Sequence, residues 1–323
     1  MENNKDIQDA LTFKRPFVQD LAFTLICPSA IKNWQSNNAD QINQQNIHVH
    51  PPKFWQQQFN KYQARLKQLD STNDYQKLTK FLMSRPSPHR LGFHFEGLVL
   101  FWLQDGFALK LHPFEIIAHN LQIIQNGQTF GELDLIVFNH DTNLVEHWEL
   151  AVKFYLGYPP FEPTNWIGIN SKDNLQRKLD HMATKPFSIN SVEVDPNQSL
   201  LGNKPLKIDK RYAVIKGRFF KPDTNSVFTK PAWLTDSFPL HTWYTVEKAN
   251  KLFTDRESLT VRAANYIEWF TCRNFYNKNS NLIVDIANTQ LDLDTNLFFA
   301  VNNEMNTTTY MVINSNNHAS SYR

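Results

Sequence analysis

Three apolar runs, each joined to the next by a short polar turn, occupy the centre of the chain and alternate as β-strands do. They are PFEIIAHNLQII (113–124), TFGELDLIVF (129–138) and NLVEHWELAVKFYL (143–156). Asn126 followed by Gly127 is a strong signal for a tight hairpin between the first two runs. The NHDTN segment after the second run has the polar composition of a loop. The pattern predicts an antiparallel meander of three strands.

Segments with helical periodicity lie on both sides of this meander. HRLGFHFEGLVLFWLQD (89–105) is apolar nearly all round in its second half, which is typical of a buried helix. Ser87 and Pro88 supply a capping hydroxyl and a first-turn proline, so we expect this helix to start there and to stop at Gly106. DNLQRKLDHMATK (173–185) predicts a second helix, and RYAVIKGRFF (211–220) predicts a further strand. The core order is therefore helix, three strands, helix, strand.

These patterns divide the chain into three consecutive regions. Residues 1–86 are expected to form a helical N-terminal extension, residues 87–221 an α/β core, and residues 222–323 a C-terminal α/β elaboration. Within the last region, 258–276 predicts a helix, while 295–302 and 308–314 predict strands. The last ~10 residues are polar, and we expect them to be frayed.

Composition narrows the class of protein. Hydrophobic residues make up 41% of the chain, enough for a packed core. The 33 basic and 31 acidic residues nearly cancel, so net charge by itself predicts no partner. Cys27 and Cys272 stand far apart in apolar or aromatic surroundings, which favours core positions in a reducing compartment. No signal peptide precedes the core, and GLVLFWL (97–103) is too short to span a bilayer, so we expect a cytoplasmic location without membrane association.

Acidic residues stand at unexpected positions on the second and third strands. Side chains alternate between the faces of a strand, so Glu149 and Lys153 share the face opposite Trp148, and Asp134 lies opposite Leu135. Hairpin partners on one face lie about 5 Å apart, so Asp134 and Glu149 can converge. Two neighbouring carboxylates repel each other unless a cation lies between them, and Mg²⁺ or Mn²⁺ accepts such oxygen ligands. The pattern indicates metal-assisted phosphodiester hydrolysis, with Lys153 stabilising charge.

A simpler interpretation stays open for the same residues. The polar positions can be the solvated face of a half-buried meander, with Glu149 and Lys153 as an ordinary surface pair. Ile136 and Phe138 share the face of Asp134, which indicates that this face is partly covered. Glu96 is a lone carboxylate on a mostly apolar helix, either buried with a partner or exposed in the first turn.

The order of the predicted helices and strands, together with these acidic residues and Lys153, resembles that of known families. An acidic helix, the strand GELDLIVF and a strand ending in Glu and Lys resemble the PD-(D/E)XK nuclease superfamily. More closely, HWELAVKFYLG, WIGINSKDNLQRKLDHM and IKGRFF resemble an uncharacterised bacterial family, domain of unknown function 1853. The resemblance implies a restriction-endonuclease-like core with a mixed sheet flanked by helices. It also implies a metal ligand at Asp134, a catalytic lysine at Lys153 and a supporting acid at Glu96. Ala151 occupies the position of the usual second acid, and Glu149 lies two residues earlier.

Local charge favours a nucleic-acid partner. Between Trp166 and Lys221 the chain has eleven basic residues against five acidic ones. A basic helix and loop beside a sheet suit contacts to phosphates, and Lys172, Arg177 and Lys178 are the expected contacts. The alternative for these residues is a solvated face.

The sequence therefore predicts a Mg²⁺- or Mn²⁺-dependent nuclease with Glu96, Asp134, Glu149 and Lys153 in its site. The alternative is a catalytically inactive nuclease-fold module that binds nucleic acid or a protein, and a third reading is a purely structural protein. The sequence has no His or Cys pattern that suits zinc and no glycine-rich loop that suits a nucleoside triphosphate.

Overall fold

The computed structural model describes residues 12–34, 47–125, 127–168, 172–192, 205–223, 228–254, 260–263, 268–271, 283–284, 297–302 and 308–314. The chain forms two compact units that interleave along the sequence. Unit 1 comprises Met1–Val152, Gln176–Gly217 and Ala232–Phe238, and unit 2 comprises Lys153–Leu175, Arg218–Pro231 and Pro239–Arg323. The three consecutive regions expected from the sequence stay a prediction.

The sheet of unit 1 is built on the meander. Its strands are β2 (Phe114–Gln125), β3 (Gln128–Asn139), β4 (Leu144–Gly157) and β8 (Lys210–Pro222), in the order β2-β3-β4-β8. The hairpins β2–β3 and β3–β4 are antiparallel, as predicted, and Gly127 takes the positive φ of 75° in the first turn. The short strand β1 (Ile47–His48) adds to β8 in parallel. Both β4 and β8 also contribute residues to unit 2.

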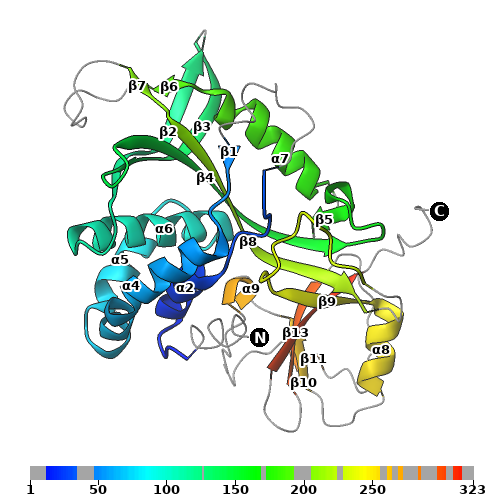
Figure 1. The fold of residues 1–323 in the computed structure, drawn as a ribbon. Helices are drawn as coiled ribbons and strands as arrows, with labels where there is room; N and C mark the ends of the chain where they lie inside the picture. Colours follow the sequence, from blue (N-terminus) through cyan, green and yellow to red (C-terminus); the bar gives the residue numbers. More distant parts are fainter. Residues whose placement is uncertain are drawn as a thin grey trace. The chain divides into compact units, whose positions relative to one another are not determined.

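Helices cover both faces of this sheet (Figure 1). They are α2 (Pro16–Ile26), α4 (Pro52–Ser71), α5 (Tyr75–Met83) and α6 (Leu91–Ala108) on one side, with α7 (Leu175–Thr184) and the 3-10 helix η2 (Pro186–Ser188) on the other. The two-stranded sheet β6 (Ser191–Val192) and β7 (Leu206–Lys207) follows η2. The sequence order α6-β2-β3-β4-α7-β8 confirms the helix, three strands, helix, strand pattern, and the fold is mixed α/β.

The prediction for both ends of α6 is wrong. Ser87 has a φ of 47°, whereas a residue that caps a helix needs an extended backbone, and Arg90 at φ −85° takes that place instead. Gly106 lies inside the helix, which continues to Ala108. A Cβ at Gly106 would come within 2.6 Å of His112 Nε2, so this glycine permits close packing rather than ending the helix.

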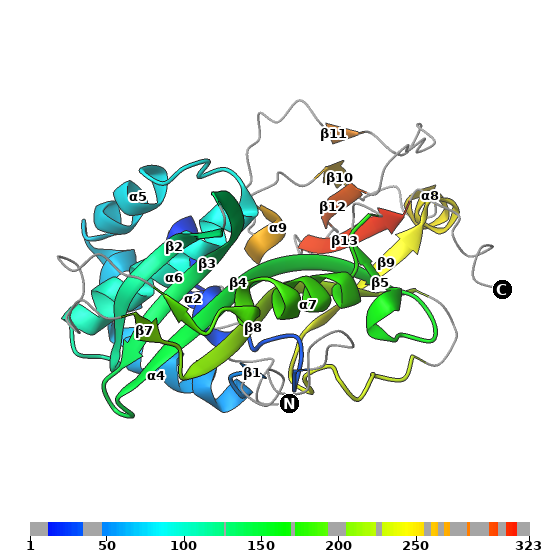
Figure 2. The ribbon, with the colours of Figure 1, turned by 90° about the horizontal axis from the view of Figure 1, so that it is seen from above.

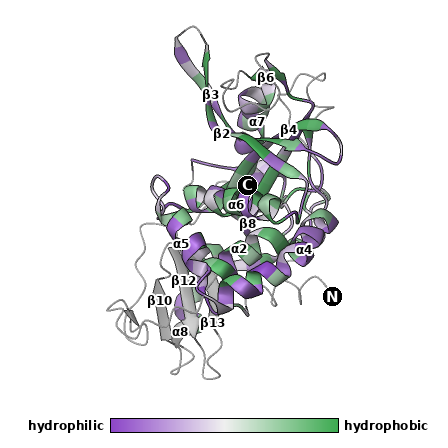
Figure 3. Ribbon diagram, turned by 90° about the vertical axis from the view of Figure 1, so that its left-hand side faces the viewer, coloured by the Kyte–Doolittle hydropathy of each residue, from purple (hydrophilic) through white to green (hydrophobic). Residues whose placement is uncertain are grey.

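Aromatic rings fill the space between the helices and the sheet. Trp148 of β4 is fully buried, and its ring centroid lies 6.4 Å from that of Trp55 on α4 and 6.3 Å from that of Trp102 on α6. The His50 ring stacks on Phe54 at 3.9 Å. Figure 3 shows both polar and apolar colour on α4, as expected for an amphipathic helix over a core. This packing fixes the position of β4, the strand that carries Glu149.

Unit 2 contains the C-terminal strands (Figure 2). They are β9 (Leu240–Thr245), β10 (Thr260–Ala263), β11 (Ile283–Val284), β12 (Leu297–Asn302) and β13 (Thr308–Asn314), with β5 (Trp166–Gly168) on β4. The helices of this unit are η1 (Pro163–Asn165), α8 (Val246–Thr254) and α9 (Glu268–Thr271). Its core includes Leu156, Phe220, Trp243 and Val312, and the Trp243 indole donates to the Gly157 carbonyl at 3.0 Å.

The late strands are confirmed, and part of the expected C-terminal helix is wrong. Residues 297–302 and 308–314 pair as antiparallel strands. In the segment 258–276, residues 260–263 form β10, which pairs with β11 on one side and β12 on the other, and only α9 is helical. Ladder hydrogen bonds on both edges override the helical periodicity there. Cys272 and the chain terminus lie outside the described residues.

None of the described helices combines the length and the apolar character that a bilayer-spanning segment needs.

Lys216 of β8 is a buried amine that ties the sheet to α2, and burial lowers its pKa to about 7. Its side chain is fully buried, its Nζ lies 3.3 Å from the centre of the Trp55 ring, and it donates to the Cys27 carbonyl at 2.6 Å and to the Thr24 carbonyl. These carbonyls belong to the C-terminal end of α2, where the helix leaves them without a partner. Lys216 therefore satisfies the helix end from the neighbouring strand.

Replacing Lys216 by Met will lower the free energy of unfolding by about 2–4 kcal/mol, because two buried carbonyls lose their donor. Chemical denaturation of both proteins measures the difference. The matched change Lys207→Met, at an exposed position of β7, will alter stability by less than about 0.5 kcal/mol. Equal stability of the two variants would contradict the role given to Lys216.

Candidate acidic site

Asp134 and Glu149 lie together at the point where β3 and β4 separate. The β3–β4 ladder runs from Asn139 and Leu144 to Leu135 and Trp148. One residue further along each strand come Asp134 and Glu149. There the Asp134 carboxyl accepts the Leu150 N–H at 2.7 Å and makes a hydrogen bond with the Glu149 carboxyl. The expected convergence of the two acids is therefore present within unit 1.

The interpretation as a solvated face is wrong for this part of β4. Glu149 is only 6% exposed and His147 is fully buried. The His147 ring packs edge-on against Phe187 of η2, with centroids 5.3 Å apart. The segment after α7 thus covers the face that alternation assigned to solvent. The buried acids need partners in place of water.

The two carboxyl groups share a proton. Burial raises the pKa of Glu149 to about 7, and the positive charge of Lys178 opposes this rise. Burial, and then the charge of Glu149, raise the pKa of Asp134 well above its usual value, while the Leu150 N–H and Lys178 oppose the rise. Both pKa values are raised, so the pair keeps a proton between its oxygens near neutral pH. Two like charges this close do not both ionise readily.

His147 holds the Glu149 carboxyl from the other side. Its Nε2 lies 3.1 Å from Glu149 Oε2. Burial, with a smaller contribution from the charge of Arg211, lowers the pKa of His147 to about 3, so the ring is neutral and Nε2–H is the donor. Among the described residues, His147 Nδ1 has no hydrogen-bond partner. Glu149 is therefore oriented by Asp134 and His147 together.

Glu96 of α6 is the third acid near this pair. Burial, and then the charge of Asp134, raise the pKa of Glu96 to about 7, while Arg85 and a hydrogen bond with Asn120 oppose the rise. Arg85 Nη2 lies 3.8 Å from Glu96 Oε2, an atom without a hydrogen-bond partner in the described part of the chain. Glu96 also raises the pKa of Glu149. The side chain is 21% exposed, so the alternative of an open first-turn position is wrong.

The four basic residues singled out from the sequence divide between the units. Arg177 and Lys178 lie on the part of α7 that belongs to unit 1, with Arg177 exposed and Lys178 half-buried. Lys153 and Lys172 belong to unit 2. Lys153 Nζ lies 2.6 Å from Asp173 Oδ2, so the expected surface pair of Lys153 with Glu149 is wrong. Lys172 is exposed.

The acids offer two ligands rather than a finished metal cage. Within the described ranges, no group of three or more His, Cys, Asp and Glu side chains is arranged to hold a metal ion. Asp134 and Glu149 form the pair that could hold one, since Mg²⁺ is commonly bound by one or two carboxylates together with waters and phosphate oxygens.

Sequence reasoning gave no role in this region to His147 and Asp173, and it gave Lys178 a different one. His147 shares the face of Glu149 by simple alternation, so that signal was present in the sequence. Lys178 was assigned to phosphate contacts, whereas its charge acts on both Asp134 and Glu149. Asp173 gave no local signal, because its pairing with Lys153 depends on how the chain returns after β5.

The fold and the site together define a mixed α/β protein with a carboxyl pair at the end of the β3–β4 ladder. Residues 19–296, most of the chain, match the family described as Domain of unknown function (DUF1853), and the chain belongs to this family. The resemblance noted from the sequence is confirmed for that family. No curated protein and no solved structure matches the chain.

The Glu149 carboxyl makes stability depend on pH. In the folded protein the pKa of Glu149 is about 7, above its ordinary value of 4.5. The protonated carboxyl therefore contributes fully to stability below pH 4.5, and this contribution is lost as the pH rises through 7. Between these values wild type will lose roughly 3 kcal/mol relative to Glu149→Gln, whose amide does not ionise. Urea unfolding across this pH range measures the difference.

The change Glu247→Gln, at an exposed position of α8, serves as the matched control and will follow wild type at every pH. Parallel pH curves for wild type and Glu149→Gln would show that the Glu149 carboxyl is not held protonated by its surroundings.

Proposed function

We propose that the protein is a divalent-metal-dependent nuclease that hydrolyses phosphodiester bonds in DNA or RNA. The observation that carries this proposal is the contact between the half-buried Asp134 carboxyl and the buried Glu149 carboxyl, with Glu96 and Lys178 close enough to act on them electrostatically. Structural meanders rarely bury several carboxyls together, because each buried charge is costly. Clusters of such groups are typical of sites that bind ions or move protons.

The residues present suit Mg²⁺ or Mn²⁺. Asp134 and Glu149 already approach each other within hydrogen-bonding contact, so a cation can replace the proton that they share. With a divalent ion bound there, the chemistry supplied is activation of a water and stabilisation of charge on the phosphate. Glu96, with an unsatisfied buried oxygen, is placed to accept a proton or to orient a water. Lys178 limits the negative charge of the cluster.

The chain order supports a PD-(D/E)XK-like core. The elements α6, β2, β3, β4, α7 and β8 follow the order of that superfamily's core, and Glu96 and Asp134 stand where its helix glutamate and strand aspartate are expected. Ala151 replaces the usual second acid, and we assign that role to Glu149, which reaches Asp134. The role of Lys153 is carried over from the resemblance, and its ion pair with Asp173 has to open for it to act.

Nucleic acid is the proposed substrate because basic side chains neighbour the acids. Arg177 and Lys178 lie on α7 within the same unit as the carboxyl pair. Their charges can neutralise phosphates of a bound strand, and Lys172 is proposed as a further contact. A cytoplasmic setting is part of this proposal, and in it the buried Cys27 stays a thiol.

A second candidate is a catalytically inactive nuclease-fold module that binds nucleic acid. Two observations favour it. Lys153 is engaged by Asp173, and the described residues contain no group of three metal-binding side chains. Such a module would keep the basic surface of α7 and bind nucleic acid without metal.

Cleavage of labelled single- and double-stranded DNA and RNA, with and without MgCl₂ or MnCl₂, tests the enzymatic proposal. Wild type will cleave at least one substrate only with metal. Asp134→Asn and Glu149→Gln will each lower the rate by on the order of 100-fold or more, because each removes a charged ligand. Lys153→Met tests the role carried over from the resemblance.

Asp141→Asn, at an exposed turn position, is the matched control and will keep wild-type activity. A wild type that neither binds the metal nor cleaves any substrate rules out the enzyme. If it still binds nucleic acid in a salt-dependent manner, the inactive module is the better description.

Changing Arg177 and Lys178 together to Met will weaken DNA binding uniformly across sequences. The slope of log K against log salt will become shallower by about two, since each duplex phosphate contact contributes about 0.9. Fluorescence anisotropy at several salt concentrations measures the slope. The paired change Lys61→Met with Lys67→Met, at exposed positions of α4, removes the same two positive charges as the α7 variant. It will leave the slope unchanged. An unchanged slope for the α7 variant would place the nucleic acid elsewhere.

A further inference from the structure

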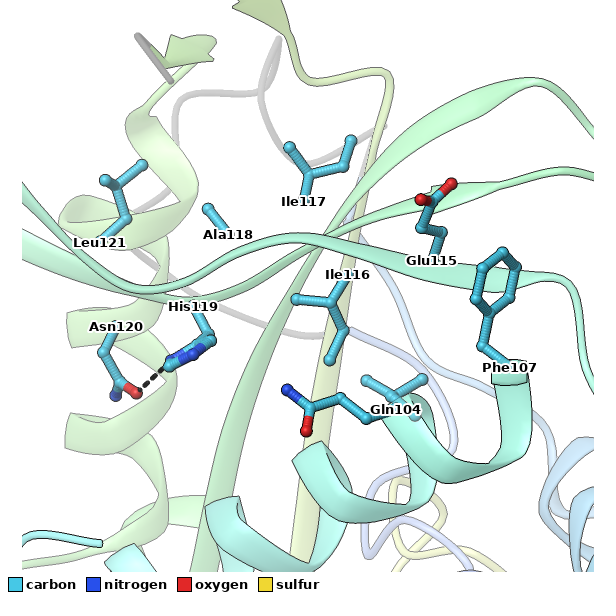
Figure 4. A pocket seen from close by; sticks show the side chains of 10 residues that line it. Gln104, Phe107, Glu115, Ile116, Ile117, Ala118, His119, Asn120 and Leu121 are labelled. Carbon is cyan, nitrogen blue, oxygen red and sulfur yellow. Dashed lines mark hydrogen bonds between the residues drawn. The ribbon is translucent and has the colours of Figure 1, made fainter. Parts of the chain in front are cut away.

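A cavity of about 720 Å³ lies beside β2 in unit 1, apart from the carboxyl pair (Figure 4). It is lined by Leu103, Gln104 and Phe107 of α6 and by Glu115, Ile116, Ile117, Ala118, His119, Asn120 and Leu121 of β2. We call this cavity the β2 groove. Asp134, Glu149 and Lys153 do not line it, although Asn120 of its lining makes a hydrogen bond with Glu96.

The lining shows which side of β2 the groove follows. Seven consecutive residues of one strand border it, so it runs for roughly 23 Å along the strand. Consecutive side chains point to opposite faces of a sheet, and Figure 4 shows Ile116 and Ile117 on opposite sides of the ribbon. A void bordered by both faces of one strand lies beside its backbone edge. That is the position of the next strand in the sheet.

The backbone of β2 is open on this edge. Within the described part of the chain, β2 pairs with β3 alone and is the last strand of its sheet. Half of its N–H and C=O groups therefore point away from β3 into the groove. Gln104 and Phe107 of α6 form a wall beside this edge (Figure 4). A bound strand would gain main-chain hydrogen bonds and a packing surface together.

Two irregularities in the backbone of β2 limit which polypeptide segments can bind in the β2 groove. The β2–β3 register shifts at Ile117, and Asn120 has a φ of 49°. Bulges and left-handed residues bend an edge strand and protect it from uncontrolled pairing with flat sheets. The groove therefore suits a short extended segment rather than a long strand of another sheet.

The charge of the groove favours a basic occupant. Its described lining contains Glu115 and no lysine or arginine. Asn120 donates to Glu132 at 3.0 Å, which brings a second, exposed carboxylate to one end. Arg85 also donates to Asn120, at 3.5 Å, but its guanidinium is mostly buried and lies 3.8 Å from the Glu96 carboxyl. Glu115 lies 2.7 Å from His140 and keeps further acceptor positions for a cation. Carboxylates repel phosphate, so a nucleic-acid strand is a poor match for this surface.

We propose that the β2 groove binds a short, extended, basic polypeptide segment of a partner protein, which adds to the sheet as the strand next to β2. Main-chain hydrogen bonds to β2 hold the segment, apolar side chains pack against α6, and basic side chains meet Glu115 and Glu132. The interaction does not depend on nuclease activity.

A fluorescein-labelled octapeptide of alternating lysine and valine is a suitable probe for the full-length protein. It will bind saturably in fluorescence anisotropy, and binding will slow hydrogen exchange of the β2 amides. The same peptide methylated at every backbone nitrogen, and an alternating glutamate and valine peptide, will each bind at least tenfold more weakly. Absence of saturable binding, or equal binding of the methylated peptide, overturns the proposal.

Gln104→Trp fills the groove from an exposed position of α6 and will weaken peptide binding at least tenfold. Gln76→Trp makes the same change at an exposed position of α5 outside the groove and will bind like wild type. Thermal unfolding of both variants shows that they are folded. If Gln104→Trp instead weakens binding of single-stranded oligothymidine and leaves the peptide unaffected, the groove belongs to nucleic acid and the proposal is wrong.

Discussion

The contact between the Asp134 and Glu149 carboxyls is the constraint on which the account of this protein depends. Two carboxyl groups in contact at the end of a strand ladder have to share a proton or bind a cation, because two negative charges repel at this distance. Their surroundings supply a backbone N–H from Leu150, an imidazole N–H from His147 and the charge of Lys178. These groups compensate part of the cost of burial, and the raised pKa values show that the compensation is incomplete. Such a pair suits the proposed exchange of its proton for a divalent ion.

The fold creates this arrangement by covering both faces of β4. Trp148 anchors one face against the tryptophans of α4 and α6. On the opposite face, His147 packs against Phe187, and Glu149 takes its place beside it under the segment that follows α7. The ladder ends at Leu135 and Trp148, and from there Asp134 uses its side chain to accept the next strand's N–H. At the far side of β3, β2 is the last described strand of the sheet, and the β2 groove lies at its open edge.

The sequence predicted the parts that depend on local pattern. Alternation and the Asn126-Gly127 turn predicted the meander, and the shared face predicted that Asp134 and Glu149 meet. The start of α6 at Leu91 depends on the left-handed backbone of Ser87, and the strand β10 depends on two neighbours distant in sequence. The covering of His147, the neighbour of Glu149 on the same face, comes from Phe187, forty positions along the chain. The pairing of Lys153 with Asp173 comes from the return of the chain after β5. Local patterns hold no information about such contacts, which arise only when distant segments pack.

The most direct test of the central claim is calorimetric titration of Mn²⁺ into the protein near pH 6.5, in buffers with different ionisation enthalpies. Both carboxyl pKa values are raised, that of Glu149 to about 7, so an ion that binds the pair will release protons, more than one for each ion at this pH, and Asp134→Asn will lose both the binding and most of the release. Binding without proton release, or no binding at all, would contradict the account.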